Sequence, residues 1–123
     1  MVDPATKPVL AYWKIRGLAQ SIRLQLAHQG VDFEDKYYEV HSEGKNEDGS
    51  EKWSTKEWTD VKFNLGLDFP NLPYFIDGDF SITETVAVHR YIAAKWAPEL
   101  LGSTPQVTGY VDMVWNVIHP LRF

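Results

Sequence analysis

The chain has 123 residues, enough for one ordinary globular domain, and its content of 44% hydrophobic and 24% charged residues argues against disorder. It contains no cysteine, which excludes disulfides, thiolate metal sites and a cysteine nucleophile, and its net charge of −5 argues against nucleic acid as the main partner. Because no apolar run approaches the roughly 20 residues of a membrane span and residues 1–8 lack the apolar core of a secretory signal, we expect a soluble, cytoplasmic protein.

The first third of the chain predicts a strand, a helix and a second strand. Residues 8–13 form a short apolar run that is typical of a buried strand. Leu18, Ile22 and Leu26 are spaced four apart and predict a helix over about 18–29, ended by a glycine at position 30. Residues 31–40 have the pattern of a second strand. Because a helix joins the two strands, we expect them to be parallel.

The middle of the chain is rich in acidic residues and poor in periodic signals. Residues 32–60 hold ten acidic side chains against four lysines, which indicates a solvated segment. Residues 41–53 show no apolar periodicity, and we expect a loop there. Ser54-Thr55-Lys56-Glu57 fits a capping box, which predicts a short helix from about Thr55 to Leu65.

The remaining third predicts a hairpin and two helices. Asp77-Gly78 separates two apolar runs, 73–76 and 80–82, as in a β-hairpin. Thr83 is the expected N-cap of a helix over 84–96, and Pro105, behind Ser103 or Thr104, is expected to begin a last helix that reaches about residue 119. The order β-α-β-α-β-β-α indicates an α/β, thioredoxin-like fold with a mixed four-stranded sheet, followed by a trailing helix.

Three motifs occur in a specific order and spacing. The first is Tyr-Trp-Lys-Ile-Arg-Gly-Leu at 12–18, the second is the stretch 62–78 that contains Asn-Leu-Pro-Tyr-Phe, and the third is Ile-Thr-Glu-Thr at 82–85, followed by Arg-Tyr-Ile-Ala at 90–93. Together these motifs, over about residues 8–97, resemble the N-terminal domain of a cytosolic glutathione transferase of the mu class.

The resemblance implies a set of functional residues. Tyr12 falls on the catalytic tyrosine of the family, and Pro73 on its cis-proline. Phe69 falls on the aromatic key at the contact between subunits. Glutathione is the implied co-substrate, with no cofactor and no metal. The implied glutathione-binding residues are Tyr12, Trp13, Leu18, Trp58, Lys62, Asn71, Leu72, Pro73, Glu84 and Thr85.

The chemistry of glutathione agrees with this assignment. A free thiol has a pKa near ~8.5, so an enzyme must stabilise the thiolate, and a tyrosine hydroxyl beside a helix N-terminus can do so. Lys62 offers a cation and Trp58 an N–H donor to a carboxylate, and a cis bond before Pro73 would leave the backbone N–H and C=O of Leu72 free for the ligand. Thr85 can bind the γ-glutamyl carboxylate.

Each of these residues also has a purely structural interpretation. Tyr12 and Trp58 can be packing aromatics, Lys62 a solvated residue and Pro73 a proline that begins a strand. Glu84 stands where the mu class usually has glutamine; it can pair with the γ-glutamyl ammonium, repel the neighbouring carboxylate or merely complement the helix dipole. The four histidines, at positions 28, 41, 89 and 119, show no metal spacing and are expected to be structural or on the surface.

We expect a glutathione-binding domain over 1–97, and over 98–123 a linker with the first helix of a truncated, all-α C-terminal domain. Most of that domain, with the wall of the electrophile pocket and the socket for Phe69, is absent from the 123 residues. Three hypotheses follow. The chain is a detoxifying transferase that conjugates glutathione to small electrophiles, a domain that only binds glutathione, or a catalytically weak or inactive subunit of a larger assembly. The expected partner is a second copy of the chain or a larger complex.

Overall fold

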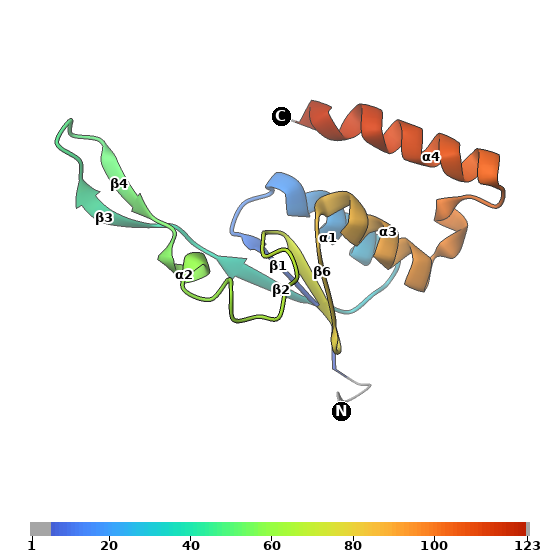
Figure 1. The fold of residues 1–123 in the computed structure, drawn as a ribbon, viewed down its shortest axis with the longest axis horizontal. Coiled ribbons are helices and arrows are strands. Elements are labelled where there is room, and N and C mark those ends of the chain that lie inside the picture. The colour runs from blue at the N-terminus through green and yellow to red at the C-terminus, as the bar shows by residue number, and fades with distance from the viewer. Residues whose placement is uncertain (1–5, 123) are drawn as a thin grey trace.

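The centre of the molecule is a mixed four-stranded sheet, seen in a computed structural model that describes residues 6–122 (Figure 1). The strand order is β2-β1-β5-β6, with β1 and β2 parallel and the other neighbouring pairs antiparallel. The bounds are Val9–Trp13 for β1, Glu34–Tyr38 for β2, Tyr74–Asp77 for β5 and Phe80–Thr83 for β6. This arrangement confirms the thioredoxin-like fold predicted from the order of elements.

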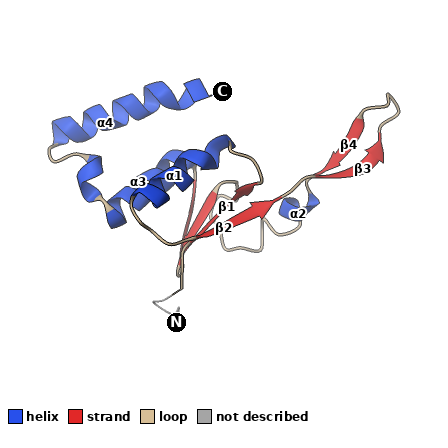
Figure 2. Cartoon of the chain, turned by 180° about the vertical axis from the view of Figure 1, so that it is seen from behind, coloured by secondary structure: helices blue, strands red, loops and turns tan. Residues whose placement is uncertain are grey.

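Two helices cover one face of the sheet. The 3-10 turn η1 (Gly17–Ala19) leads directly into α1 (Gln20–His28), and α3 (Thr85–Trp96) lies beside α1 (Figure 1, Figure 2). The apolar residues that predicted these helices point into the core. The fully buried side chains that join helices and sheet include Leu10, Ile22, Leu26, Phe75, Val88 and Ile92. The 3.6-residue periodicity therefore identified both helices because their inner faces are buried.

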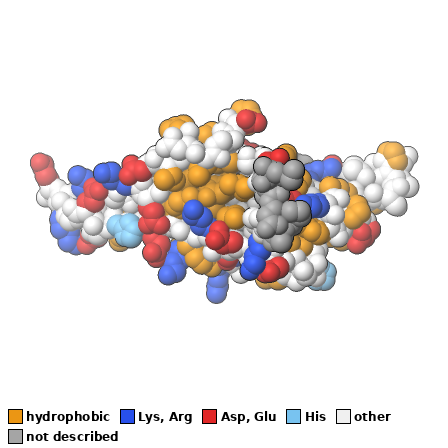
Figure 3. All heavy atoms as spheres, turned by 90° about the horizontal axis from the view of Figure 1, so that it is seen from below, with side chains coloured by type: hydrophobic (Ala, Val, Ile, Leu, Met, Phe, Trp, Pro, Cys, Tyr) orange, Lys and Arg blue, Asp and Glu red, His pale blue; other side chains and the backbone are white. Residues whose placement is uncertain are grey.

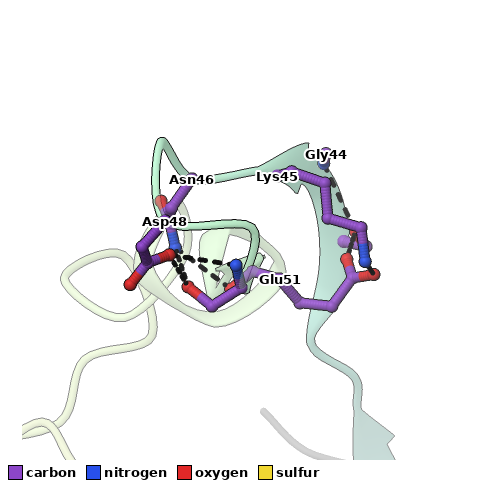
Figure 4. A network of polar contacts seen from close by, with 7 residues as sticks. Gly44, Lys45, Asn46, Asp48 and Glu51 are labelled. Carbon is purple, nitrogen blue, oxygen red and sulfur yellow. Dashed lines mark hydrogen bonds and ion pairs between the residues drawn. The ribbon is translucent and has the colours of Figure 1, made fainter.

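The expected loop at 41–53 is wrong, because the chain forms a second, two-stranded sheet there. Strands β3 (His41–Lys45) and β4 (Glu51–Ser54) pair antiparallel and project from the main sheet as a ribbon (Figure 1). All of β3 is exposed, so it carries no alternation of apolar residues. Polar contacts hold the ribbon instead: Glu51 accepts from Ser42 and pairs with Lys45 at 2.5 Å, and the turn is closed by Asn46, Asp48 and Ser50 (Figure 4).

The second helix is much shorter than its capping box predicts. Helix α2 spans only Lys56–Thr59, and the chain continues in turns through Asn64. The only buried side chain of α2 is Trp58. Gly66, with φ at 75°, then redirects the chain toward β5. A single anchoring aromatic, rather than an apolar stripe, is the reason that the helix extends over one turn only.

The C-terminal helices agree with the predicted ranges, with one difference at the start of α3. Thr83 does not cap that helix; its hydroxyl donates to the carbonyl of Phe69 at 2.8 Å, and α3 begins at Thr85. After a 3-10 turn, η2 (Pro98–Leu101), helix α4 (Pro105–Ile118) begins behind Thr104, whose hydroxyl accepts the N–H of Val107 at 3.2 Å. A final 3-10 turn, η3, spans His119–Arg122.

Helix α4 lies over α1 and α3, on the side away from the sheet (Figure 1, Figure 2). Arg90 of α3 pairs with Asp112, and the ring of His89 lies 4.6 Å from the ring of Trp115. His89 itself is buried between α1 and α3, where it contacts Ser21 and Gln25, which confirms its structural role. Within residues 6–122, no helix combines the length and the apolar character needed to cross a membrane.

Candidate active site

The hydroxyl of Tyr12 lies at the beginning of the first helical segment. Tyr12 belongs to β1, and its side chain is 7% exposed. The backbone N–H of Leu18, in the first turn of η1, donates a hydrogen bond to the Tyr12 Oη at 3.2 Å. This bond holds the hydroxyl at the beginning of η1. Because the oxygen accepts from the backbone, the Tyr12 O–H can still donate to a further group.

Gly17 leaves room for the Tyr12 hydroxyl to lie against the backbone at the start of η1. The sequence motif alone did not predict this role. Its φ is +40°, and a Cβ on Gly17 would lie 2.6 Å from the Tyr12 Oη and 2.8 Å from the edge of the ring. A side chain at this position would therefore displace the hydroxyl. The glycine of the Tyr-Trp-x-Ile-x-Gly-Leu motif acts as a positioning residue, which could only be recognised once the two residues were seen together.

Strand register brings the motif residues to one edge of the sheet. Ala11 of β1 pairs with Tyr74 of β5, and Tyr74 pairs with Thr83 of β6. Tyr12 therefore lies beside the residue that precedes Tyr74, which is Pro73, and Glu84 follows on the other side. The C-terminal end of β1, the beginning of β5 and the end of β6 thus form a common edge.

The bond between Leu72 and Pro73 is cis, as the resemblance implied. The backbone does not leave the Leu72 N–H free, however, because this group donates to the Asn71 Oδ1 at 2.9 Å. The expectation of an unpaired N–H is therefore wrong for the ligand-free chain. The exposed side chain of Asn71 satisfies a donor that would otherwise be left unpaired next to the buried Leu72.

An aromatic cluster fixes α2 against this edge. Trp58 is 5% exposed and stacks on Tyr74 with ring centroids 5.9 Å apart, while Tyr38 meets its edge at 5.3 Å. The hydroxyls of Tyr38 and Tyr74 lie 2.9 Å apart, and burial together with this bond raises the pKa of Tyr74. The Lys62 Nζ lies 6.0 Å from the Trp58 ring. Trp58 is thus a core residue that also positions a cation.

The start of α3 has an unusual backbone. Glu84 has φ at 75° and ψ at 119°, a conformation that costs a non-glycine residue on the order of 1–3 kcal/mol. Its side chain is exposed, whereas Thr85, the first residue of α3, is buried. Strained residues of this kind concentrate at ligand sites.

The side chain of Phe69, which the resemblance places at a contact between subunits, is 79% exposed in this chain.

A hollow of about 470 Å³ opens beside Trp13, between the β1–η1 link and the end of β2. Its apolar walls are Trp13, Ile15 and Val40, and Thr55 closes it at the base of α2. Of the predicted site residues only Trp13 lines this hollow. The strand register places Tyr12, Pro73 and Glu84 at the sheet edge described above, and Trp13, the last residue of β1, connects that edge to the hollow.

Comparisons with known proteins agree with this geometry. The family model described as glutathione S-transferase, N-terminal domain, matches residues 8–94. A glutathione S-transferase of Tyrophagus putrescentiae is 54% identical over 92 residues, which are 75% of this chain and 38% of the relative. The glutathione S-transferase Mu 1 of Bos taurus is 41% identical over 114 residues, covering 93% of this chain and 48% of the relative.

Solved structures give the same result. The crystal structure of the glutathione S-transferase Blo t 8 superposes with a TM-score of 0.76 at 35% identity, over 93% of this chain and 46% of that one. The chain thus spans about half, or less, of the length of the relatives it matches. The match over 8–94 and the identity to mu-class enzymes confirm the resemblance seen in the motifs. This chain belongs to the family of glutathione S-transferase N-terminal domains.

Proposed function

We propose that the chain binds reduced glutathione along the common edge of β1, β5 and β6, and that Tyr12 stabilises its thiolate for transfer to an electrophile. The observation that carries this proposal is the Tyr12 hydroxyl, which accepts the Leu18 N–H at 3.2 Å and keeps its own hydrogen for the sulfur. The proposal makes Tyr12 the catalytic residue. Glutathione is the co-substrate, and the reaction needs no further cofactor.

The energy required matches what one hydrogen bond supplies. Lowering the pKa of a thiol by two units takes about 2.7 kcal/mol. A hydrogen bond to a charged group contributes about 1.5–3 kcal/mol, and the Leu18 N–H strengthens the donor by polarising the hydroxyl. In the reaction the thiol of glutathione first loses its proton to water, and the thiolate sulfur then attacks the electrophilic carbon. In a substitution, the carbon–sulfur bond forms as the bond to the leaving group breaks and the leaving group departs with that electron pair. In an addition to a double bond, the π electron pair moves to the neighbouring atom, which takes a proton from water.

The rest of the tripeptide fits the polar groups along the sheet edge. The Lys62 ammonium and the Trp58 indole are the proposed donors to the glycyl carboxylate. Leu72 binds the cysteinyl backbone through its carbonyl and through an N–H that must first leave Asn71. Thr85 receives the γ-glutamyl carboxylate, and Glu84 pairs with the ammonium beside it. Trp13, Leu18 and Pro73 supply the apolar contacts.

The hollow lined by Trp13, Ile15 and Val40 is the proposed position of the electrophile. Ile15 is 58% exposed and Val40 is 46% exposed, so an apolar co-substrate would bury surface that now faces water. This supports a small, apolar electrophile. A cytoplasmic location, where reduced glutathione is abundant, and association into dimers or a larger complex belong to the same proposal.

Calorimetry and kinetics test the proposal together. We expect reduced glutathione to bind the purified chain at neutral pH, and Tyr12→Phe to keep this affinity while lowering the conjugation rate roughly ten- to a hundred-fold, because a hydrogen bond of about 1.5–3 kcal/mol is lost. The assay uses 1-chloro-2,4-dinitrobenzene as electrophile and thiolate absorbance as a second signal.

The outcomes separate the three hypotheses for this chain. Binding without turnover would leave a glutathione-binding module. A folded chain that releases no heat with glutathione up to ~10 mM would overturn the proposal and favour a structural subunit. Equal rates for Tyr12→Phe and the unchanged chain would make Tyr12 a packing residue.

A further inference from the structure

The link between β1 and η1 forms one wall of the hollow beside Trp13. Lys14 and Ile15 belong to this link and line the hollow. Residues 14–16 form neither helix nor strand, so no regular ladder of hydrogen bonds fixes them. The Lys14 N–H donates to the Tyr38 carbonyl at 2.9 Å, and the Ile15 N–H donates to the Trp13 carbonyl at 2.7 Å. The position of the wall therefore also depends on what binds the Ile15 carbonyl.

The Ile15 carbonyl is bound by Arg23, a residue of α1. The Arg23 Nη1 donates to this carbonyl at 3.0 Å and to the Gln20 Oε1 at 3.1 Å. The Arg23 Nε donates to the Asp35 Oδ1 at 3.1 Å, and Asp35 lies in β2. One planar guanidinium group thus joins the link, helix α1 and strand β2.

The guanidinium group is itself held in place. The side chain of Arg23 is 12% exposed, and its Cζ lies 5.3 Å from the centroid of the Tyr37 ring. The Tyr37 hydroxyl donates to the Asp35 Oδ2 at 2.8 Å, so both oxygens of that carboxylate are bound. The contacts with Asp35 and Tyr37 therefore set the position from which Arg23 reaches the link.

We propose that Arg23 is a positioning residue for the electrophile site. By holding the Ile15 carbonyl it fixes the apolar wall of the hollow, and so determines how well the chain accepts larger apolar groups. Among the described residues that line the hollow Arg23 is absent, so it acts through Ile15. This inference rests on the proposed function, because it takes the hollow as the place of the electrophile.

A lysine cannot take over this role. Arg23→Lys keeps the positive charge and can still pair with Asp35. Its single ammonium, at the end of a flexible chain, cannot hold Asp35, Gln20 and the Ile15 carbonyl in the planar arrangement of the guanidinium group. We therefore expect Arg23→Lys to keep the fold and to loosen the link.

Calorimetry with two S-alkyl derivatives of glutathione tests the proposal without turnover. S-methylglutathione and S-hexylglutathione differ only in the length of the alkyl chain, which the hollow would bury. We expect the hexyl derivative to bind the unchanged chain about tenfold more tightly than the methyl derivative. In Arg23→Lys this ratio should fall to about threefold or less, with the affinity for S-methylglutathione kept within about twofold.

Two further variants make the test specific. Arg16→Lys is the matched control, because Arg16 lies in the same link with an exposed side chain, and it should leave the ratio unchanged. Ile15→Ala removes the side chain that Arg23 positions. In the Ile15→Ala background, Arg23→Lys should change the ratio by less than about twofold, because the two residues act as a unit. Circular dichroism and urea unfolding confirm that each variant is folded.

The possible results distinguish this inference from the proposed function. If neither derivative nor glutathione binds the unchanged chain, the proposed function fails and this inference fails with it. If both derivatives bind the unchanged chain equally, glutathione binding stands and the role of Arg23 is overturned. The role of Arg23 is also overturned by a ratio that Arg23→Lys leaves unchanged, or lowers just as much in the Ile15→Ala background. A parallel loss of affinity for both derivatives would make Arg23 a support of the whole domain instead.

Discussion

Gly17 determines where the Tyr12 hydroxyl lies, so it offers a test that leaves Tyr12 itself unchanged. In Gly17→Ala the new Cβ would meet the Oη at 2.6 Å and the hydroxyl must move. We expect the conjugation rate to fall about as far as in Tyr12→Phe, roughly ten- to a hundred-fold, with glutathione affinity kept within a few-fold. Steady-state kinetics and calorimetry measure the two quantities.

Gly30→Ala is the matched control for this prediction. Gly30 also has a positive φ, at 70°, but a Cβ there would meet nothing within 4 Å. Both variants pay a backbone cost of about 1–2 kcal/mol for a side chain in the left-handed region. Only Gly17→Ala disturbs the tyrosine. If both variants lose activity equally, backbone strain rather than the position of the hydroxyl is responsible.

At the scale of elements, the junction of α1, α3 and α4 contains a histidine that resists protonation. Burial, with a smaller effect from His119, lowers the pKa of His89 to about 4. The unfolded chain takes up this proton near pH 6.5, whereas the folded chain does so only near pH 4. The free energy of unfolding should therefore fall as the pH drops from about 6.5 to about 4, by on the order of 3 kcal/mol, and level off below.

Urea unfolding at pH 7, 5.5 and 4 measures this loss. His89→Gln keeps a side chain of hydrogen-bonding groups but cannot titrate. Carboxylates contribute equally to both proteins, so the difference in unfolding free energy between the unchanged chain and His89→Gln isolates the histidine. A difference that stays constant across the three pH values would contradict the prediction.

The sequence predicted elements well wherever burial leaves a pattern. Helices α1, α3 and α4 each have an apolar stripe, and their ranges agree with the structure to within a few residues. β3 has none because all five of its residues are exposed, so its strand pairing left no trace in the hydropathy. The capping box at Ser54 predicted where α2 begins, but its end depends on how Trp58 packs against Tyr74.

Part of the candidate site could likewise be predicted from the sequence, and part of it could not. The motifs of the family identified Tyr12 and the cis bond before Pro73, and the fold brings both to one edge of the sheet. Two other features could not be predicted from the motifs: the hydrogen bond from the Leu72 N–H to Asn71, and the close contact between Gly17 and the Tyr12 hydroxyl. Both depend on interatomic distances, which the sequence does not give.

At the scale of the whole molecule, the β3–β4 ribbon is separate from the core. It adds no side chain to the buried cluster, and its end of the molecule is covered with acidic and basic groups (Figure 3). Replacing residues 43–50 by a two-residue Asn-Gly turn should therefore change the free energy of unfolding by no more than about 0.5 kcal/mol. Urea unfolding measures this. A loss of several kcal/mol would show that the ribbon supports the domain.

The stack of Trp58 on Tyr74, with Lys62 above the indole, also has an optical consequence. The emission wavelength of an indole depends on the electric field across its ring, and the Lys62 ammonium lies 6.0 Å from the ring of Trp58. A ligand carboxylate that draws this ammonium toward itself would change the field without touching the ring. The cluster that holds α2 in place would thereby act as a built-in fluorescent reporter of an occupied site.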